Sequence, residues 1–221
     1  MSPIRVSRAG SALQAASVVF DFGAVLFQWR PLQLLQQVVP ELAPDEDSAR
    51  RLATQIFESF TPDSDWARFD LGRIDEAALA RRIAARIGAQ PAQVRRVIDA
   101  IPPHLQAQPA TVALLSRLKA AGHRLFYLSN MPLPYAAHLE RENRFIADFD
   151  DGIFSGRVGL MKPHDAIFEL AVQRFALDPA RTLFIDDHAG NVQAARRLGW
   201  QALQFVDAAQ CEQAVQDAGW L

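Results

Sequence analysis

The sequence has few of the features that mark secreted, redox-active or nucleic-acid-binding proteins. Cys211 is the only cysteine, so an intrachain disulfide and a CxxC site are both excluded, and we expect a reducing, cytoplasmic location. No apolar run approaches the roughly 20 residues that span a bilayer, and residues 1–16 lack the apolar segment of a secretory signal. The formal net charge of −2 offers no basic surface, so neither a nucleic acid nor a membrane is an expected partner.

The chain of 221 residues is long enough for one domain of ordinary size that carries a smaller inserted module. Half of its residues are hydrophobic and 22% are charged, a balance typical of globular proteins. We predict a loose arm over residues 1–16, an α/β core over residues 17–31 and 105–221, and an all-helical insert over residues 32–104.

Helical periodicity identifies the insert. Leu79, Ile83 and Ile87 recur every four residues, which places them on one face of an amphipathic helix. We expect Asp75 to cap the start of this helix and Gly88 to end it.

A second helix is predicted over residues 90–100, ended by Pro102 and Pro103. After these prolines, helical and β-rich segments alternate. Such alternation predicts an α/β fold with a doubly wound, mostly parallel sheet and right-handed crossovers. Strands are expected over residues 17–21, 124–128, 153–154, 182–185 and 201–205.

Three of these strands end in polar residues. Asp21 follows the first strand, Ser129 and Asn130 follow the second, and Asp186 and Asp187 follow the strand TLFI. Because the carboxyl ends of strands in a doubly wound sheet share one edge, these side chains are expected to converge on one site.

Carboxylates that converge repel one another, and a hard divalent cation stabilises them. Mg²⁺, bound by one or two carboxylates, waters and a substrate phosphate, is the usual solution. Lys162, just before Pro163, could neutralise a phosphate or a nucleophile in the same site. The pattern therefore indicates a site for a metal and a phosphate.

Four ordered segments, VVFDFGAVL, LFYLSN, GLMKP and TLFIDDHAGN, resemble the motifs of the haloacid dehalogenase-like superfamily across about residues 17–205, and the insert resembles its cap. The resemblance implies a phosphatase in which Asp21 attacks phosphorus and water hydrolyses the aspartyl-phosphate. The implied substrate is a small phosphorylated metabolite.

The resemblance also assigns roles to single residues. It implies that Asp21 and Lys162 are catalytic residues and that the substrate is bound by Phe22, Ser129, Asn130 and Lys162. It also implies that Mg²⁺ is bound by Asp21, the Gly23 carbonyl, Asp186 and Asp187.

The sequence departs from the commonest pattern of the superfamily at Gly23, where an aspartate usually acts as general acid and base. That help is typically worth roughly 10²- to 10⁴-fold. Three alternatives follow: turnover is low, the substrate has a good leaving group, or another residue transfers the proton. His164 and His188 are the candidates for that residue. A branch with this DxG motif, typified by glucose-1-phosphate phosphatase, is similar to the chain and points to a sugar phosphate.

Two other functions remain open. A metal-independent 2-haloacid dehalogenase would also use an aspartate nucleophile, although Asp186 and Asp187 without a cation would oppose an anionic acid. A catalytically weak binding protein would explain the missing acid at Gly23, although the retained Asp21 and Lys162 speak against it.

Five residues of the insert and its hinge are ambiguous from the sequence. Each either faces the substrate or serves the structure, and we favour the structural role. They are Trp29, Arg30, Phe69, Asp70 and Arg73.

Overall fold

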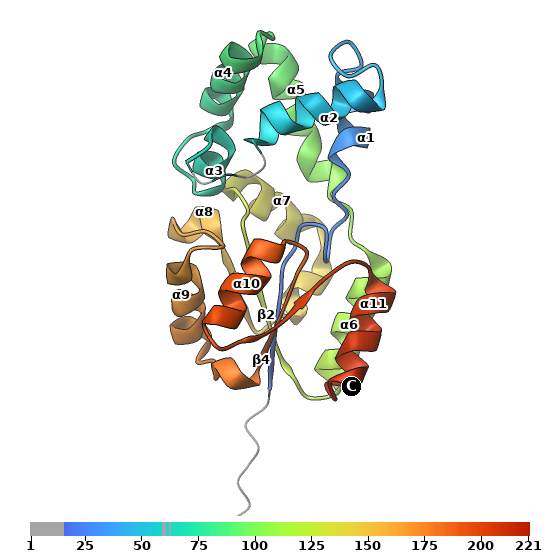
Figure 1. Ribbon diagram of the computed structural model, residues 1–221, viewed down its shortest axis with the longest axis vertical. Coiled ribbons are helices and arrows are strands. Elements are labelled where there is room, and N and C mark those ends of the chain that lie inside the picture. The colour runs from blue at the N-terminus through green and yellow to red at the C-terminus, as the bar shows by residue number, and fades with distance from the viewer. Residues whose placement is uncertain (1–15, 59–60, 62) are drawn as a thin grey trace, which may run out of the picture.

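The computed structural model describes residues 16–58, 61 and 63–221, so the predicted arm, apart from Ala16, lies outside the described residues. One parallel sheet forms the centre of the described chain (Figure 1). Its strands run in the order β3-β2-β1-β4-β5, and every neighbouring pair is parallel. The strands are β1 (Ser17–Phe20), β2 (Arg124–Ser129), β3 (Asp151–Phe154), β4 (Thr182–Asp186) and β5 (Gln201–Gln204).

Helices cover both faces of the sheet. In β1, Val19 packs in one apolar cluster with Phe168 and Ala194, whereas Phe20 packs in the other with Leu115, because successive strand residues point to opposite faces. One face carries α9 (Asp165–Phe175) and α10 (Ala189–Arg197), and the other α6 (Pro109–Ala120), α7 (Leu133–Glu142) and α11 (Ala208–Asp217). The predicted doubly wound α/β fold is confirmed.

Three short helical elements complete this part of the chain. They are η2 (Arg144–Asp148), α8 (Ser155–Val158) and η3 (Pro179–Arg181).

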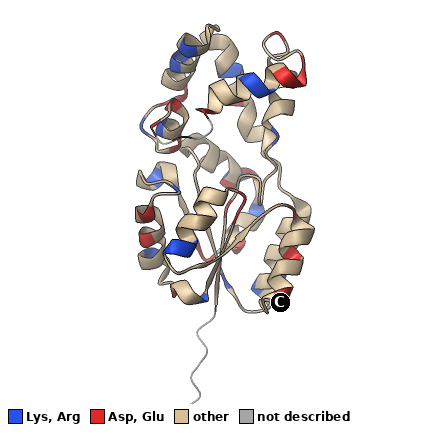
Figure 2. Cartoon of the chain, viewed as in Figure 1, with Lys and Arg blue, Asp and Glu red and all other residues tan. Residues whose placement is uncertain are grey.

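Of the six helices that the structure describes between β1 and β2, α6 covers a face of the sheet and the other five sit beyond the carboxyl ends of the strands (Figure 1). They are α1 (Pro31–Val38), α2 (Glu46–Phe57), α3 (Asp65–Asp70), α4 (Glu76–Ile87) and α5 (Pro91–His104). As predicted, the Asp75 side chain caps α4 by accepting a hydrogen bond from the Ala78 N–H, and Gly88 ends it in the left-handed conformation. Basic and acidic residues are interspersed over the chain (Figure 2). Within the described residues, no helix combines the length and apolarity needed to cross a bilayer.

The prediction that Pro102 and Pro103 end the second helix was wrong. Helix α5 continues through both prolines to His104. Pro102 has no N–H to donate to the carbonyl of Ile98, four residues earlier. The hydroxyl of Tyr135 in α7 donates to that carbonyl instead, at 2.8 Å, so a bond from another helix replaces the missing one.

The two chain segments that join α1 and α5 to the sheet are hydrogen-bonded to each other. The Gln28 N–H donates to the Gln106 carbonyl at 2.9 Å, and the Gln108 N–H donates to the Leu26 carbonyl at 2.8 Å. The Gln108 side-chain amide also donates to the carbonyl of Ala24 at 2.8 Å. These bonds hold the entry and exit of the five helices side by side, directly after the end of β1.

Candidate active site

Asp21 lies at the end of β1 and marks the base of the site. Its N–H donates to the carbonyl of Ile185 in β4 at 2.9 Å, which fixes the backbone at the edge of the sheet. Its carboxylate accepts a hydrogen bond from the Phe22 N–H at 2.7 Å and forms an ion pair with Lys162 at 3.0 Å. The Asp21 side chain is therefore held in one orientation, with the Lys162 ammonium beside it.

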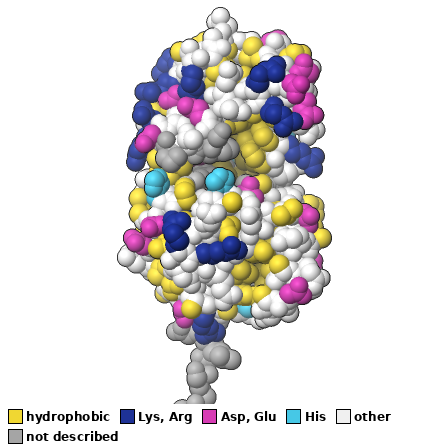
Figure 3. Space-filling model, in the orientation of Figure 1, with side chains coloured by type: hydrophobic (Ala, Val, Ile, Leu, Met, Phe, Trp, Pro, Cys, Tyr) yellow, Lys and Arg dark blue, Asp and Glu magenta, His cyan; other side chains and the backbone are white. Residues whose placement is uncertain are grey.

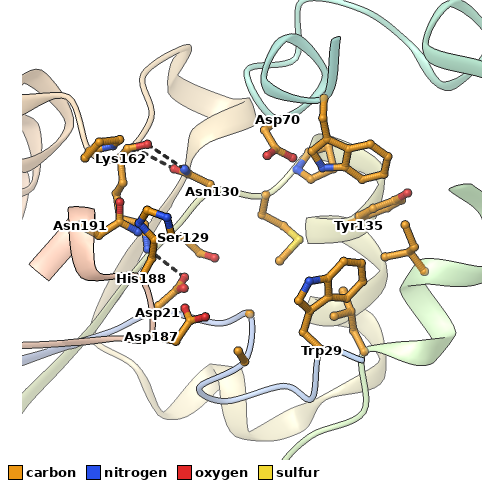
Figure 4. A pocket seen from close by; sticks show the side chains of 18 residues that line it. Asp21, Trp29, Asp70, Ser129, Asn130, Tyr135, Lys162, Asp187, His188 and Asn191 are labelled. Atoms are coloured by element: carbon orange, nitrogen blue, oxygen red, sulfur yellow. Dashed lines mark hydrogen bonds and ion pairs between the residues drawn. The ribbon is translucent and has the colours of Figure 1, made fainter. Parts of the chain in front are cut away.

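Lys162 is 1% exposed and is shared by two carboxylates, because its ammonium also contacts Asp186 at 2.6 Å. Both polar ends of the Asn130 side chain bind its main chain. The Asn130 amide nitrogen donates to the Lys162 carbonyl at 3.0 Å, and the Lys162 N–H donates to the Asn130 amide oxygen at 2.9 Å (Figure 4). Asn130 thus places the lysine from the loop after β2.

The two adjacent aspartates after β4 have different surroundings. The Asp186 carboxylate is fully buried and accepts hydrogen bonds from Lys162, the Asn191 side chain and the His188 N–H. Asp187 is exposed and lines the cavity. Carboxylate oxygens of Asp21, Asp186 and Asp187 lie within 4.8 Å of one another, so the predicted convergence of the strand ends is present.

Burial and mutual repulsion disturb the pKa values of these groups. Burial raises the pKa of Asp21 to about 7; the charge of Lys162 lowers it, and those of Asp186 and Asp187 raise it further. Although the Asp187 residue is exposed at the cavity, partial desolvation of its carboxyl group and the charge of Asp186 raise its pKa to about 6. Burial alone would lower the pKa of Lys162, but the charges of Asp186 and Asp21 outweigh it and raise the pKa.

This donor set fits a hard divalent cation. Three carboxylates converge, and the one ammonium beside them pairs with only two, so negative charge is in excess; oxygen atoms are the ligands that Mg²⁺ prefers. Asp21, Asp187 and the backbone at Gly23 line the open cavity, whereas the Asp186 oxygens are taken up by buried donors.

The cavity has a polar base and a largely apolar opposite wall (Figure 4). The base holds the carboxylates, Ser129 and Lys162. On the face shown in Figure 3, histidine side chains lie where the sheet-bearing part meets the five helices. The opposite wall consists of Trp29, Trp66, Asp70, Ile101, Leu105, Met131 and Tyr135.

The sequence model of the haloacid dehalogenase-like hydrolases matches residues 17–199. The chain belongs to this family. A relative, the sesquiterpene phosphatase astK of Aspergillus oryzae, is 27% identical over 192 residues, which cover 86% of this chain and 90% of the relative. As a haloacid dehalogenase-like hydrolase of this kind, the chain is an enzyme that cleaves its substrate with water.

Solved structures share the fold. A predicted HAD-like family hydrolase from Porphyromonas gingivalis has a TM-score of 0.69 and 24% identity, covering 92% of this chain and 97% of that one. A HAD family enzyme from Bacteroides thetaiotaomicron, in complex with magnesium and inorganic phosphate, has a TM-score of 0.64 and 20% identity, covering 86% and 93%. Dehalogenase structures have the fold as well, so the fold does not separate phosphatase from dehalogenase.

The structure separates the predicted site residues of this hydrolase into groups. The cavity is lined by Asp21, Gly23, Ser129, Asn130, Lys162 and Asp187. The Phe22 side chain is fully buried and packs against Tyr127 and Phe154, with ring centroids at 4.8 and 5.1 Å, so only its backbone lies at the site. Of the two candidate histidines, His188 lines the cavity and the exposed His164 does not.

The five residues that were ambiguous from the sequence also differ in where they lie. Phe69 is buried between Trp66 and Tyr135, and Arg30 and Arg73 are exposed, so a structural or surface role fits these three. Trp29 and Asp70 line the cavity, and Trp29 also packs against Phe57 with ring centroids at 5.2 Å.

Trp66 and Tyr135 are wall residues that the sequence analysis did not single out. Buried aromatic residues on helices are the ordinary content of a core. Only the packing of α3 and α7 places these two side chains at the cavity.

Proposed function

We propose that the chain is a Mg²⁺-dependent phosphatase that forms an aspartyl-phosphate on Asp21. One observation carries the proposal: Asp21, Lys162 and Asp187 meet at the base of one cavity. A phosphate seated there would be attacked by the Asp21 carboxylate, with the ester oxygen leaving into the cavity. Water then attacks phosphorus, and cleavage of the bond between phosphorus and Asp21 restores the carboxylate.

The other residues hold the phosphoryl group in place. Lys162 neutralises it beside the nucleophile, and Ser129, buried at the end of β2, lies within the same cavity wall. Mg²⁺, held by Asp21, Asp187 and the Gly23 carbonyl, would supply charge neutralisation for the phosphoryl oxygens. Asp186 then has a supporting role, because it orients Lys162.

The charge balance favours this reaction over dehalogenation. Lys162 is already shared by Asp21 and Asp186, and the cavity base has no other cationic side chain among the described residues to bind the carboxylate of a haloacid. A phosphate brought with Mg²⁺ avoids this repulsion. The retained nucleophile and lysine likewise favour an active enzyme over a weak binding protein. A cytoplasmic location stays a prediction from the sequence.

The wall of the cavity favours a phosphate ester with an apolar organic group over a sugar phosphate. Asp70 is the polar exception in this wall: Trp29, Trp66, Ile101 and Leu105 offer no acceptor for sugar hydroxyls, and the Tyr135 hydroxyl already donates to the main chain of α5. Helices α3 and α5 contribute Trp66, Asp70 and Ile101 to this wall, and we propose that the five helices beyond the sheet act as a cap that excludes water (Figure 1). The relative that is named a sesquiterpene phosphatase supports the same substrate class.

Phosphate release from matched esters tests the proposal. Isoprenyl and alkyl phosphates of increasing length should be hydrolysed with Mg²⁺ and not with EDTA, and faster than glucose 1-phosphate. Asp21→Asn should abolish release from every ester while the protein stays folded. Halide release from 2-chloropropionate that persists in EDTA would instead establish the dehalogenase, and a preference for the sugar phosphate would contradict the substrate class.

A further inference from the structure

Asp70 is a buried acidic residue that faces the proposed reaction from the helical side. It lies at the end of α3, is 5% exposed and lines the cavity. Figure 4 places it across the cavity from Asp21 and Asp187. Within the described residues, no hydrogen bond or ion pair engages its carboxyl group.

The main chain of Asp70 is fixed to the loop that carries the phosphate-site residues. The Ser155 hydroxyl donates to the Asp70 carbonyl at 2.6 Å and accepts a hydrogen bond from the Met131 N–H at 2.9 Å. Met131 directly follows Asn130, which holds Lys162. A short chain of hydrogen bonds therefore links the position of Asp70 to the base of the site.

Close packing of two glycines supports the same placement. Gly72, just after α3, has a φ of +69°, and a Cβ there would lie 2.9 Å from the carbonyl oxygen of Gly156 in α8. Only glycine allows this approach without a shift of the backbone. The end of α3 is thus seated against the core by contacts that do not involve the Asp70 carboxyl group.

A buried carboxyl group without a partner is costly when ionised, so its environment favours the neutral acid. Burial raises the pKa of Asp70 to about 8, with a further contribution from the charge of Asp21. The nearby Tyr135 hydroxyl, which donates to the Ile98 carbonyl, is not a donor to it. Asp70 therefore holds a proton near neutral pH, which a general acid needs.

The remaining observation is the glycine at position 23. It puts no acid beside the nucleophile, and nothing lies within 4 Å of a Cβ built there. The nucleophile thus has open space on the side where related enzymes carry an aspartate, and an acidic group faces it from α3.

We propose that Asp70 is the general acid and base of the reaction, in place of the residue absent at position 23; this rests on the proposed phosphatase function. As the Asp21 oxygen bonds to phosphorus and the bond from phosphorus to the ester oxygen breaks, Asp70 donates its proton to that oxygen and the alcohol leaves. Asp70, now ionised, accepts a proton from water as the water oxygen bonds to phosphorus and the bond to Asp21 breaks. Phosphate departs, and Asp70 is protonated again.

Two esters with different leaving groups distinguish a general acid from a residue that only binds substrate or stabilises the fold. For Asp70→Asn, kcat/KM should fall by roughly 10²- to 10⁴-fold on an alkyl phosphate, whose alkoxide needs the proton. On p-nitrophenyl phosphate, whose phenolate leaves without help, kcat/KM should stay close to that of the unaltered enzyme. Asp99→Asn is the matched control, because Asp99 is an exposed carboxylate on α5 paired with Arg95, and it should change neither value.

A rescue variant tests the same assignment from the other side. In the Asp70→Asn background, Gly23→Asp should restore hydrolysis of the alkyl phosphate, since the open space at position 23 accepts the side chain. Asp70→Ala makes the same comparison if the asparagine variant does not fold, as judged by circular dichroism.

Three results would overturn the assignment. They are equal losses on both esters, no loss on either, and an increase in KM alone. If the unaltered enzyme released phosphate from neither ester, the proposed phosphatase function would fail instead, so the two failures are distinguishable.

Discussion

At the scale of single residues, the site depends on which buried charges have partners. Lys162 is almost completely buried, yet two carboxylates pair with its ammonium and the Asn130 amide binds its main chain. Asp70 is buried to a similar degree, with no partner for its carboxyl group among the described residues. The partners of Lys162 stabilise its charged form, whereas the lack of a partner favours the neutral form of Asp70.

The Asp70 carboxyl group should make stability depend on pH. Its pKa is raised from an ordinary acidic value to about 8 in the folded chain, so between about pH 4 and about pH 8 the folded state binds the extra proton. Its contribution to stability is therefore lost as pH rises through this window, by at most ~1.4 kcal/mol per pH unit. Asp70→Asn removes the effect, so the variant should gain stability relative to the parent chain from pH 5 to pH 8.

Urea unfolding in EDTA at pH 5, 6, 7 and 8 measures this difference. A constant difference between the two proteins would show that Asp70 titrates normally. Asp99→Asn, an exposed change that leaves the Asp70 carboxyl group in place, is the matched control.

At the scale of elements, α5 is held to α7 by the bond between the Tyr135 hydroxyl and the Ile98 carbonyl. Tyr135→Phe should lower the free energy of unfolding by about 1–3 kcal/mol, because the buried carbonyl loses its donor. In a Pro102→Ala background the same change should cost less, since the alanine N–H can make the helical bond. Urea unfolding of the four proteins of this cycle gives the coupling, and an equal cost in both backgrounds would contradict the account.

Local patterns in the sequence predicted most elements, and the exceptions have a common cause. The α/β alternation located the strands, and their polar ends located Asp21, Ser129 and Asp187 at one site. The extension of α5 was missed because its compensating donor, Tyr135, is 37 residues away from Ile98.

The position of Asp70 at the cavity was also missed because it depends on a contact between residues far apart in the sequence. It sits in a helix of six residues, too short for a clear periodic pattern, and its position depends on the contact between Gly72 and Gly156. Neither the periodicity nor the motifs of the sequence contain that contact.

At the scale of the whole molecule, metal binding and folding should be coupled. Three convergent carboxylates with one ammonium destabilise the metal-free state, and a cation that binds only the folded chain stabilises it. At a Mg²⁺ concentration of 100 times the dissociation constant the gain is about 2.7 kcal/mol. For a chain of this size, that corresponds to a rise in Tm of about 5–11 °C.

Thermal unfolding with EDTA and with Mg²⁺ measures the shift. Asp187→Asn should reduce the shift in Tm, because Asp187 lines the cavity whereas the neighbouring Asp186 is buried. Asp178→Asn is the control and should leave the shift unchanged, because Asp178 is an exposed residue that caps η3. An unchanged Tm in the parent chain would mean that the cluster does not bind the metal.

The covalent intermediate on Asp21 is the most direct test of the whole account. Enzyme turning over an alkyl phosphate with Mg²⁺ is quenched in acid, digested and analysed by mass spectrometry. We expect one added phosphoryl group on the peptide that contains Asp21, with more of it accumulating in Asp70→Asn once p-nitrophenyl phosphate is the substrate, because that variant lacks the base for the second step. Release of phosphate with no phosphoryl group on Asp21 in either protein would contradict the account.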